Sequence, residues 1–245
     1  MTHASIVRTA IAGALVLRSA NASAQSIKDA RSAFADGRFL EAADVGEALG
    51  TSDGYTVAAK ALAVYAHYEA AEEEWDEVIE RAMRMGEEAV RADSTNPEAH
   101  CQYAHAVGRY ALRVGTFAAI RKGLAGKVRD ALEAALDIDP DYSGAHMILG
   151  GWHAGVAEAG FIARRIYGAS REAAVHHYER ALERVPDSKI LLYEYGIRLP
   201  GLDPEGGRER AVEMLEKALW LPVRDVYEDY IHLDILDGLD VLSGR

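Results

Sequence analysis

The sequence predicts an all-α protein in which one helix–turn–helix unit recurs along the chain to form an α-solenoid. The first observation is the stretch 127–151, whose first half has apolar residues at three- and four-residue spacings, typical of one buried helix face (Val128, Ala131, Leu132, Ala135 and Leu136). Asp139-Pro140 then ends that helix, because proline disfavours the helical conformation of the residue before it. The second observation is that this pattern recurs. The third is that no stretch shows the period-two alternation of a β-strand.

Small residues at equivalent positions align the copies with one another. An alanine occurs at steps of 46, 46 and 37 residues, and a proline follows most of these alanines four or five residues later (Ala89, Ala135, Ala181, Ala218; Pro140, Pro186, Pro222). The next helix then carries a large residue followed by a small one (Tyr103-Ala104, Leu149-Gly150 and Tyr195-Gly196). Because each repeat of a solenoid packs only on its neighbours, we expect four to five helical pairs in a single domain, residues 25–245. Gly150 is expected where paired helices approach closely.

The elements follow in order from the turn and cap residues. We expect a first pair over 26–49 that turns at Asp36-Gly37, followed by helices over 55–68 and 75–92. The next helix, 97–113, begins where Asn96 supplies a cap and Pro97 the first helical residue.

Two insertions separate the helices of the middle repeats, over residues 115–126 and 160–168. Each contains an aromatic residue and a basic pair (Phe117, Arg121, Lys122; Phe161, Arg164, Arg165). Either they are helical extensions with apolar residues packed on a neighbour and basic groups in water, or they form a basic rim for an anionic ligand. The turn-rich stretch 199–207 is expected to be a mobile loop. Residues 226–242 are expected to form the helix that caps the last repeat.

These residues resemble the tetratricopeptide repeat (TPR) superfamily, whose signature is a Leu-Gly pair, a Gly-x-Tyr/Phe-x-x-Ala turn, an Ala-Leu pair and a proline. The segment 149–199 is also similar to the regulator-of-microtubule-dynamics family of TPR-like proteins, through its Leu-Gly-x-Trp stretch, its basic-aromatic insertion and the helix around Tyr178. The usual TPR period is about 34 residues, so two steps here are longer by about 12. The resemblance implies a right-handed solenoid with two extended repeats.

The same resemblance implies a concave groove lined by the first helix of each repeat. The residues it places there are Lys60, Val64, His67, Tyr68, His105, Arg109, Met147, Tyr193 and Ile197, with Cys101 and Gly151 beside them. Aromatic residues beside arginine and histidine suit a protein or peptide partner. Arg109 has an alternative interpretation, as the ion-pair partner of an acid from the acidic run 69–80.

Several function classes find no support in the sequence. A net charge of −12 disfavours nonspecific nucleic-acid binding. No phosphate loop, nucleophile elbow or zinc helix occurs, so we expect neither an enzyme nor a cofactor. His100, Cys101 and His105 are the nearest approach to a metal site, but their spacing does not converge on one ion. We therefore expect no metal.

Residues 1–24 are predicted to be a signal peptide. Arg8 precedes an uncharged apolar run, Ala10–Leu17, and Ala22-Ser23-Ala24 has the small residues of a cleavage site. The run is too short to span a bilayer. Periplasmic or secreted localisation follows. The alternative is a mitochondrial transit peptide, because the segment contains arginine and serine and lacks acids.

The sequence as a whole predicts a non-enzymatic scaffold that binds a protein or peptide in its groove. One alternative is a periplasmic ligand-handling subunit of a tripartite solute transporter, which a closed apolar pore through the array would distinguish. The other, from the narrower resemblance, is a mitochondrial or microtubule-linked regulator. The sequence does not specify the oligomeric state.

Overall fold

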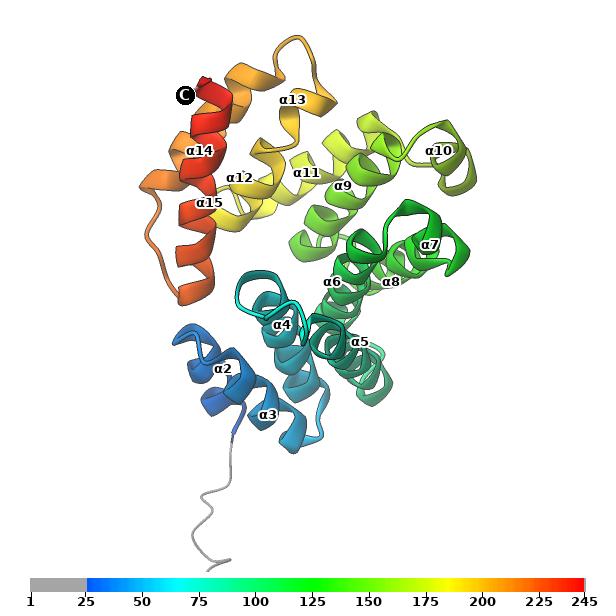
Figure 1. Ribbon diagram of the computed structural model, residues 1–245, viewed down its shortest axis with the longest axis vertical. Coiled ribbons are helices and arrows are strands. Elements are labelled where there is room, and N and C mark those ends of the chain that lie inside the picture. Colours follow the sequence, from blue (N-terminus) through cyan, green and yellow to red (C-terminus); the bar gives the residue numbers. More distant parts are fainter. Residues whose placement is uncertain (1–25, 245) are drawn as a thin grey trace, which may run out of the picture.

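The computed structural model describes residues 26–244 and contains 14 α-helices and no strand in that part of the chain (Figure 1). The predicted all-α solenoid is confirmed. The predicted signal segment, residues 1–24, lies outside the described residues. Five helices begin the successive pairs: α2 (Ile27–Ala35), α4 (Ser52–Tyr68), α6 (Pro97–Val114), α9 (Ser143–Glu158) and α12 (Lys189–Gly196). Five complete them: α3 (Phe39–Leu49), α5 (Trp75–Ala92), α8 (Leu124–Ile138), α11 (Arg171–Arg184) and α14 (Gly207–Trp220).

Four further helices interrupt or end the array. The two insertions form short helices between the members of a pair, α7 (Thr116–Arg121) and α10 (Phe161–Tyr167). The stretch expected to be a mobile loop instead contains a helical turn, α13 (Leu199–Leu202). That expectation was wrong because Leu199 and Leu202, three residues apart, are both buried in the core. The last helix is α15 (Val226–Ser243).

Local capping explains where the pairs begin. The Asn96 side chain accepts hydrogen bonds from the backbone N–H groups of Glu98 (3.0 Å) and Ala99 (3.3 Å), with Pro97 as the first helical residue. Ser170 and Asp225 cap α11 and α15 in the same way. A capping side chain satisfies N–H groups that have no partner within the helix, so each sequence signal fixes a helix start.

Small residues allow the pairs to pack closely, as the repeat pattern indicates. The four aligned alanines are completely buried in the second helices (Ala89, Ala135, Ala181 and Ala218). A side chain on Gly150 would lie 2.7 Å from the ring of Tyr178, and one on Gly86 would lie 2.7 Å from the backbone of Tyr103. Only glycine fits such contacts, so these positions set the distance between helices.

The C-terminal helix does more than cap the last repeat. It runs back to the first pair, where the Tyr227 ring lies edge-on to Phe34 (centroids 6.4 Å apart). Its Asp234 accepts a hydrogen bond from the Tyr68 hydroxyl (2.7 Å), and its Tyr230 stacks on Tyr68 (4.6 Å). In Figure 1, α15 (red) extends from α14 toward α2 (blue), so the array closes on itself.

No helix among the described residues combines the length and the apolar character that crossing a membrane requires.

Candidate functional site

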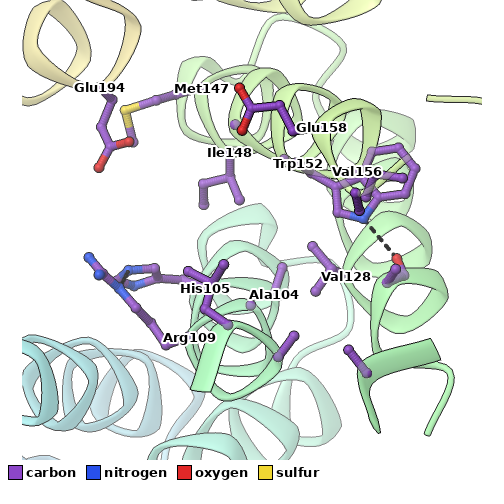
Figure 2. Close-up of a pocket in the computed structure, with 18 of the residues that line it drawn as sticks. Ala104, His105, Arg109, Val128, Met147, Ile148, Trp152, Val156, Glu158 and Glu194 are labelled. Atoms are coloured by element: carbon purple, nitrogen blue, oxygen red, sulfur yellow. Dashed lines mark hydrogen bonds between the residues drawn. The ribbon is translucent and has the colours of Figure 1, made fainter. Parts of the chain in front are cut away.

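A pocket of about 580 Å³ lies on the inner side of the array, mainly between α6, α8 and α9, with α7 and α10 at its rim. Figure 2 shows its middle, where apolar side chains of α9 face those of α6 and α8. Its walls are predominantly apolar there (Ala104, Val128, Ile148, Trp152 and Val156). The volume falls in the range of small-molecule sites, about 300–1,000 Å³.

Two glycines keep this space open. Gly108 on α6 and Gly155 on α9 both line the pocket, and a side chain added at either would meet no atom within 4 Å. Gly150, on the same helix as Gly155, has no such space. The two faces of α9 therefore use glycine differently: one face for contact with α11, the other for the cavity.

One end of the pocket is polar. It is lined by Lys60 from α4, His105 and Arg109 from α6, Glu194 from α12, and Arg198 from the turn between α12 and α13. Glu194 and Arg198 form an ion pair (2.7 Å) that neutralises both. In the part of the chain that the structure describes, neither Lys60 nor Arg109 has a carboxylate within ion-pairing distance. This end therefore carries two positive charges without carboxylate partners; the Lys60 ammonium lies over the Phe34 ring (4.6 Å).

His105 positions Arg109 without neutralising it. The Arg109 Nε–H donates to Nε2 of His105 (3.2 Å), which requires an unprotonated Nε2. Burial, and then the positive charges of Arg109, His67 and Lys60, lower the pKa of His105 to about 3. The imidazole is therefore neutral at physiological pH. The same charges acting on one ring show that Lys60 and Arg109 share a single electropositive region.

Two buried polar atoms near the pocket lack hydrogen-bond partners among the described residues. One is Oε1 of Gln102, a lining residue. The other is the Tyr178 hydroxyl, which lies 3.3 Å from the position that a Cβ on the lining residue Gly151 would occupy. An unsatisfied buried polar group costs about 1–3 kcal/mol, so water or a ligand group that hydrogen-bonds to either atom is favoured there.

The structure brings together five of the nine residues that the resemblance places in a groove. Lys60, Val64, His105, Arg109 and Met147 line the pocket, as does Gly151. The other four do not line it: Tyr68 is bound to α15, the exposed His67 lies against Tyr68, Tyr193 packs on the core, and Ile197 is partly exposed. The neighbouring Cys101 is buried in the core between α6 and α8. Tyr68, Tyr193 and Ile197 lie outside the pocket because α15 occupies their end of the concave surface.

The alternative interpretation of Arg109 does not hold in the structure. The arginine that pairs with the acidic run is Arg113, one turn further along α6, which binds Glu72. Arg109 faces the pocket instead. Four residues on a helix separate the two side chains by little more than one turn, too fine a difference for the repeat register to resolve.

Some pocket residues were not among the expected groove residues. These are Ile190 and Glu194 of α12 and Arg198 just after it. Each lies within one helical turn of Tyr193 or Ile197, the residues that the repeat alignment placed in the groove. Trp152 packs between repeats: it is 8% exposed and donates from Nε1 to the Ala125 carbonyl (2.9 Å). The same indole also forms a wall of the pocket.

The histidines form a cluster that the sequence did not indicate. Nδ1 of His146 on α9 lies 2.9 Å from Nδ1 of His177 on α11, and His153 stacks on His177 (5.3 Å). His146 Nε2 lies 3.0 Å from the carbonyl of Pro140, so it is the donor nitrogen and Nδ1 accepts from His177. No group of three or more potential ligands in the described part of the chain is arranged to hold a metal ion.

Comparison with known proteins matches residues 51–243 to the family model described as "Regulator of microtubule dynamics protein 1-3". No curated protein matches the chain. Among solved structures, a thermophilic TPR protein of Thermus thermophilus (TTC0263) is 15% identical, with a TM-score of 0.60, covering 86% of this chain and 96% of its own. YrrB, described as a TPR protein with an unusual peptide-binding site, is also 15% identical, with a TM-score of 0.41 and coverage of 90% and 96%. The first of these likenesses shows a TPR-like fold.

Proposed function

The chain belongs to the regulator of microtubule dynamics protein 1-3 family. We propose that it is a non-enzymatic binding protein whose interior pocket holds an apolar ligand with one anionic group. The observation that carries this proposal is the pair of cations without carboxylate partners, Lys60 and Arg109, at one end of a mainly apolar cavity. The other polar lining residues are Gln102, Thr116 and Glu158, and Glu158 lies on α9 toward α10, away from these cations (Figure 2). An arginine with free N–H donors binds a carboxylate or phosphate through two parallel hydrogen bonds. The apolar part of the ligand then lies between Val128, Ile148 and Trp152.

Burial of the ligand supplies most of the affinity, and the cations orient it. Apolar area removed from water contributes about 25 cal/mol per Å². An anion in this low-dielectric environment would be costly without Lys60 and Arg109, so the same two residues select anionic ligands over neutral ones. The Glu194–Arg198 ion pair is already satisfied and leaves the charge of these cations unchanged.

Two sources can supply such a ligand: a free amphipathic acid, or the C-terminus of a partner protein that ends in apolar residues. The second keeps the scaffold role that the sequence predicts, with the groove reduced to a pocket by α15. The closed array favours the first, because the remaining cavity has the volume of a small-molecule site. Both sources present one carboxylate and an apolar chain.

Binding of oleate, measured by isothermal titration calorimetry, tests the proposal. Oleate should bind, and oleyl alcohol, which has the same chain without the charge, should bind at least about tenfold more weakly, equivalent to about 1.4 kcal/mol. Arg109→Ala should weaken oleate binding by a similar factor. It should change the melting temperature little, because Arg109 makes no ion pair among the described residues and loses only its hydrogen bond to His105. Arg113→Ala is the matched control on the same helix.

Peptides distinguish the two sources of ligand. A short peptide with apolar residues and a free C-terminal carboxylate should compete with oleate if a partner protein is the natural ligand, and its amidated form should not. Failure of both oleate and the free peptide to bind would refute the proposal. Equal binding to wild type and Arg109→Ala would refute the role of Arg109.

Export remains part of the proposal, supported by the apolar run and by Ala22-Ser23-Ala24. Mass spectrometry of the protein from its native cells should find an N-terminus near Gln25 in the periplasmic or secreted fraction. Processed protein in mitochondria would establish the transit-peptide alternative instead.

A further inference from the structure

The two insertions have the same design although they belong to different repeats. Helix α7 lies between Gly115 (φ 80°) and Gly123 (φ 65°), and α10 between Gly160 (φ 106°) and Gly168 (φ 70°). Positive φ angles are readily adopted by glycine alone, so each short helix is turned sharply away from its neighbours at both ends. In Figure 1 both project at the same edge of the molecule, beside α8 and α9.

Each of these helices has an inner and an outer face. Ala119 and Ile120 of α7, and Ala163 and Tyr167 of α10, line the pocket. The outer faces carry large apolar side chains in contact with water: Phe117 is 81% exposed, Phe161 67%, Ile162 70% and Ile166 57%. The sequence suggested that the apolar residues of the insertions pack on a neighbouring helix. Only the residues on the inner faces do so. Such a group of exposed apolar residues marks an interaction surface.

Positive charge accompanies these apolar residues. The insertions hold Arg121, Lys122, Arg164 and Arg165 and no acidic residue, on a chain whose net charge is −12. None of the four forms an ion pair within the described residues; Lys122 lies over the Tyr110 ring (4.7 Å). Cations without ion-pair partners beside exposed phenylalanine and isoleucine have the composition of an interfacial membrane-binding segment.

We propose that the outer faces of α7 and α10 dock the protein on an anionic lipid bilayer. Phe117, Phe161, Ile162 and Ile166 would enter the boundary between headgroups and acyl chains, and the four cations would contact lipid phosphates. A bilayer fits this surface better than a folded partner does, because the apolar residues protrude from two short helices and form no concave, desolvated centre. Distributed negative charge matches distributed positive charge without any need for shape complementarity.

Docking would bring the pocket to the membrane. Because the inner faces of the same two helices line the pocket, its rim would face the lipid surface when the outer faces are embedded. The docking does not rest on the proposed ligand: vesicle binding can fail while oleate binding succeeds, and the reverse. The two experiments therefore test the two proposals separately.

Flotation of the full chain with vesicles tests the docking. Vesicles of phosphatidylcholine with about 30% phosphatidylserine should bind the protein at low salt, and pure phosphatidylcholine should bind at least about tenfold less. Raising the salt to about 0.5 M should release most of the bound protein, because screening shortens the range of the attraction. Phe117→Ser with Phe161→Ser, and separately Arg164→Gln with Arg165→Gln, should each reduce partitioning about tenfold or more.

Matched controls come from exposed residues elsewhere on the molecule. Trp220 is 88% exposed on α14, and Arg84 is an exposed cation on α5. Trp220→Ser and Arg84→Gln should partition like the wild type. The N-terminal segment is the same in every variant, so its own contribution cancels. No binding to the anionic vesicles, or undiminished binding of the double phenylalanine variant, would overturn the proposal.

Discussion

The two ends of the concave surface differ in what covers them. At one end, α15 lies across α2, α4 and α12, so that residues such as Tyr68 and Tyr193 become part of an aromatic core. At the other end, α6 and α9 face an unfilled cavity flanked by α7 and α10. Equivalent positions of a repeat therefore serve as core in one place and as pocket wall in another. What decides between the two roles is whether another helix reaches the surface.

Because α15 covers one end of the concave surface, a ligand site can lie only at the end that α15 leaves uncovered. A helical-repeat protein presents its first helices on one continuous surface. Here the C-terminal helix covers one end of that surface, and the remainder is a mainly apolar pocket with Lys60 and Arg109 at its inner end. The pocket occupies part of the predicted groove, and the closed apolar pore that would distinguish a transporter subunit is not seen among the described residues.

The largest expected effect concerns the filled end. Ile231 of α15 is 1% exposed, so Ile231→Ala should lower the free energy of unfolding by about 2–5 kcal/mol through lost burial and a cavity. Leu233, on the outer face of the same helix and 55% exposed, supplies the control, and Leu233→Ala should change it by less than about 0.5 kcal/mol. Urea denaturation measures both. Equal, small losses would show that α15 is only loosely attached.

Gly150 and Gly155 of α9 test the difference between a helix contact and a cavity wall, because Gly150 touches α11 and Gly155 lines the pocket. Gly150→Leu should destabilise the protein by about 1–3 kcal/mol, because the new side chain meets the Tyr178 ring. Gly155→Leu should leave stability unchanged or raise it, since glycine inside a helix costs about 0.5–1 kcal/mol. The same Gly155→Leu change should abolish oleate binding by filling the pocket. Calorimetry on both variants, for melting and for binding, checks the pair; retained oleate binding in Gly155→Leu would contradict the site.

The hydrogen bond between Tyr68 and Asp234 tests how firmly α15 closes the array. Burial, reinforced by Asp234, raises the pKa of Tyr68, so its hydroxyl stays a donor. Tyr68→Phe should cost about 0.5–1.5 kcal/mol in thermal or urea unfolding. Tyr55→Phe, a half-buried tyrosine on the same helix, is the control. A loss no greater than that of the control would mean that stacking on Tyr230 alone holds the contact.

The smallest effect at neutral pH lies in the histidine cluster between α9 and α11. Burial, and then the neighbouring His146 and His153, lower the pKa of His177 from 6.5 to about 4. The unfolded chain therefore binds more protons between these values, so stability is full above about pH 6.5 and falls as the pH drops toward 4.

Substitution at the cluster isolates this contribution from general acid unfolding. His177→Gln should flatten the stability profile between pH 6.5 and about 4, while His176→Gln at the exposed neighbouring position should leave its shape unchanged. Melting temperatures across that range measure the difference. Parallel profiles for all three proteins would show that His177 does not carry the effect.

The sequence was sufficient to predict the fold because its signals are local. The Asn96 cap, the Asp139-Pro140 break and the four aligned alanines each act within one or two turns. The start of α6 at Pro97 and the end of α8 at Ile138 follow from the first two. The mobile loop was predicted wrongly because the burial of Leu199 and Leu202 depends on distant helices.

The site was only partly predictable for the same reason. The register of the repeats was enough to bring Lys60, His105, Arg109 and Met147 to one pocket. The return of α15 was not predictable, because no local signal links Tyr68 to Asp234, which are 166 residues apart. The cavity also exists because no atom lies within 4 Å of the place where a side chain on Gly108 or Gly155 would begin. Such an empty volume depends on how distant helices pack, so no local sequence pattern predicts it.

The contact between α15 and the first pair also bears on how the protein is made. A ribosome synthesises all five pairs before Val226–Ser243 exists, so α2 and α4 emerge with Phe34 and Tyr68 exposed. Most solenoids can nucleate anywhere and propagate from neighbour to neighbour. Here the long-range contacts form last and at high loop-closure cost, so closure should be a late and slow step. Tyr227, which seals the inner end of the pocket, belongs to that last segment. A nascent chain therefore holds no complete binding site until α15 has left the ribosome.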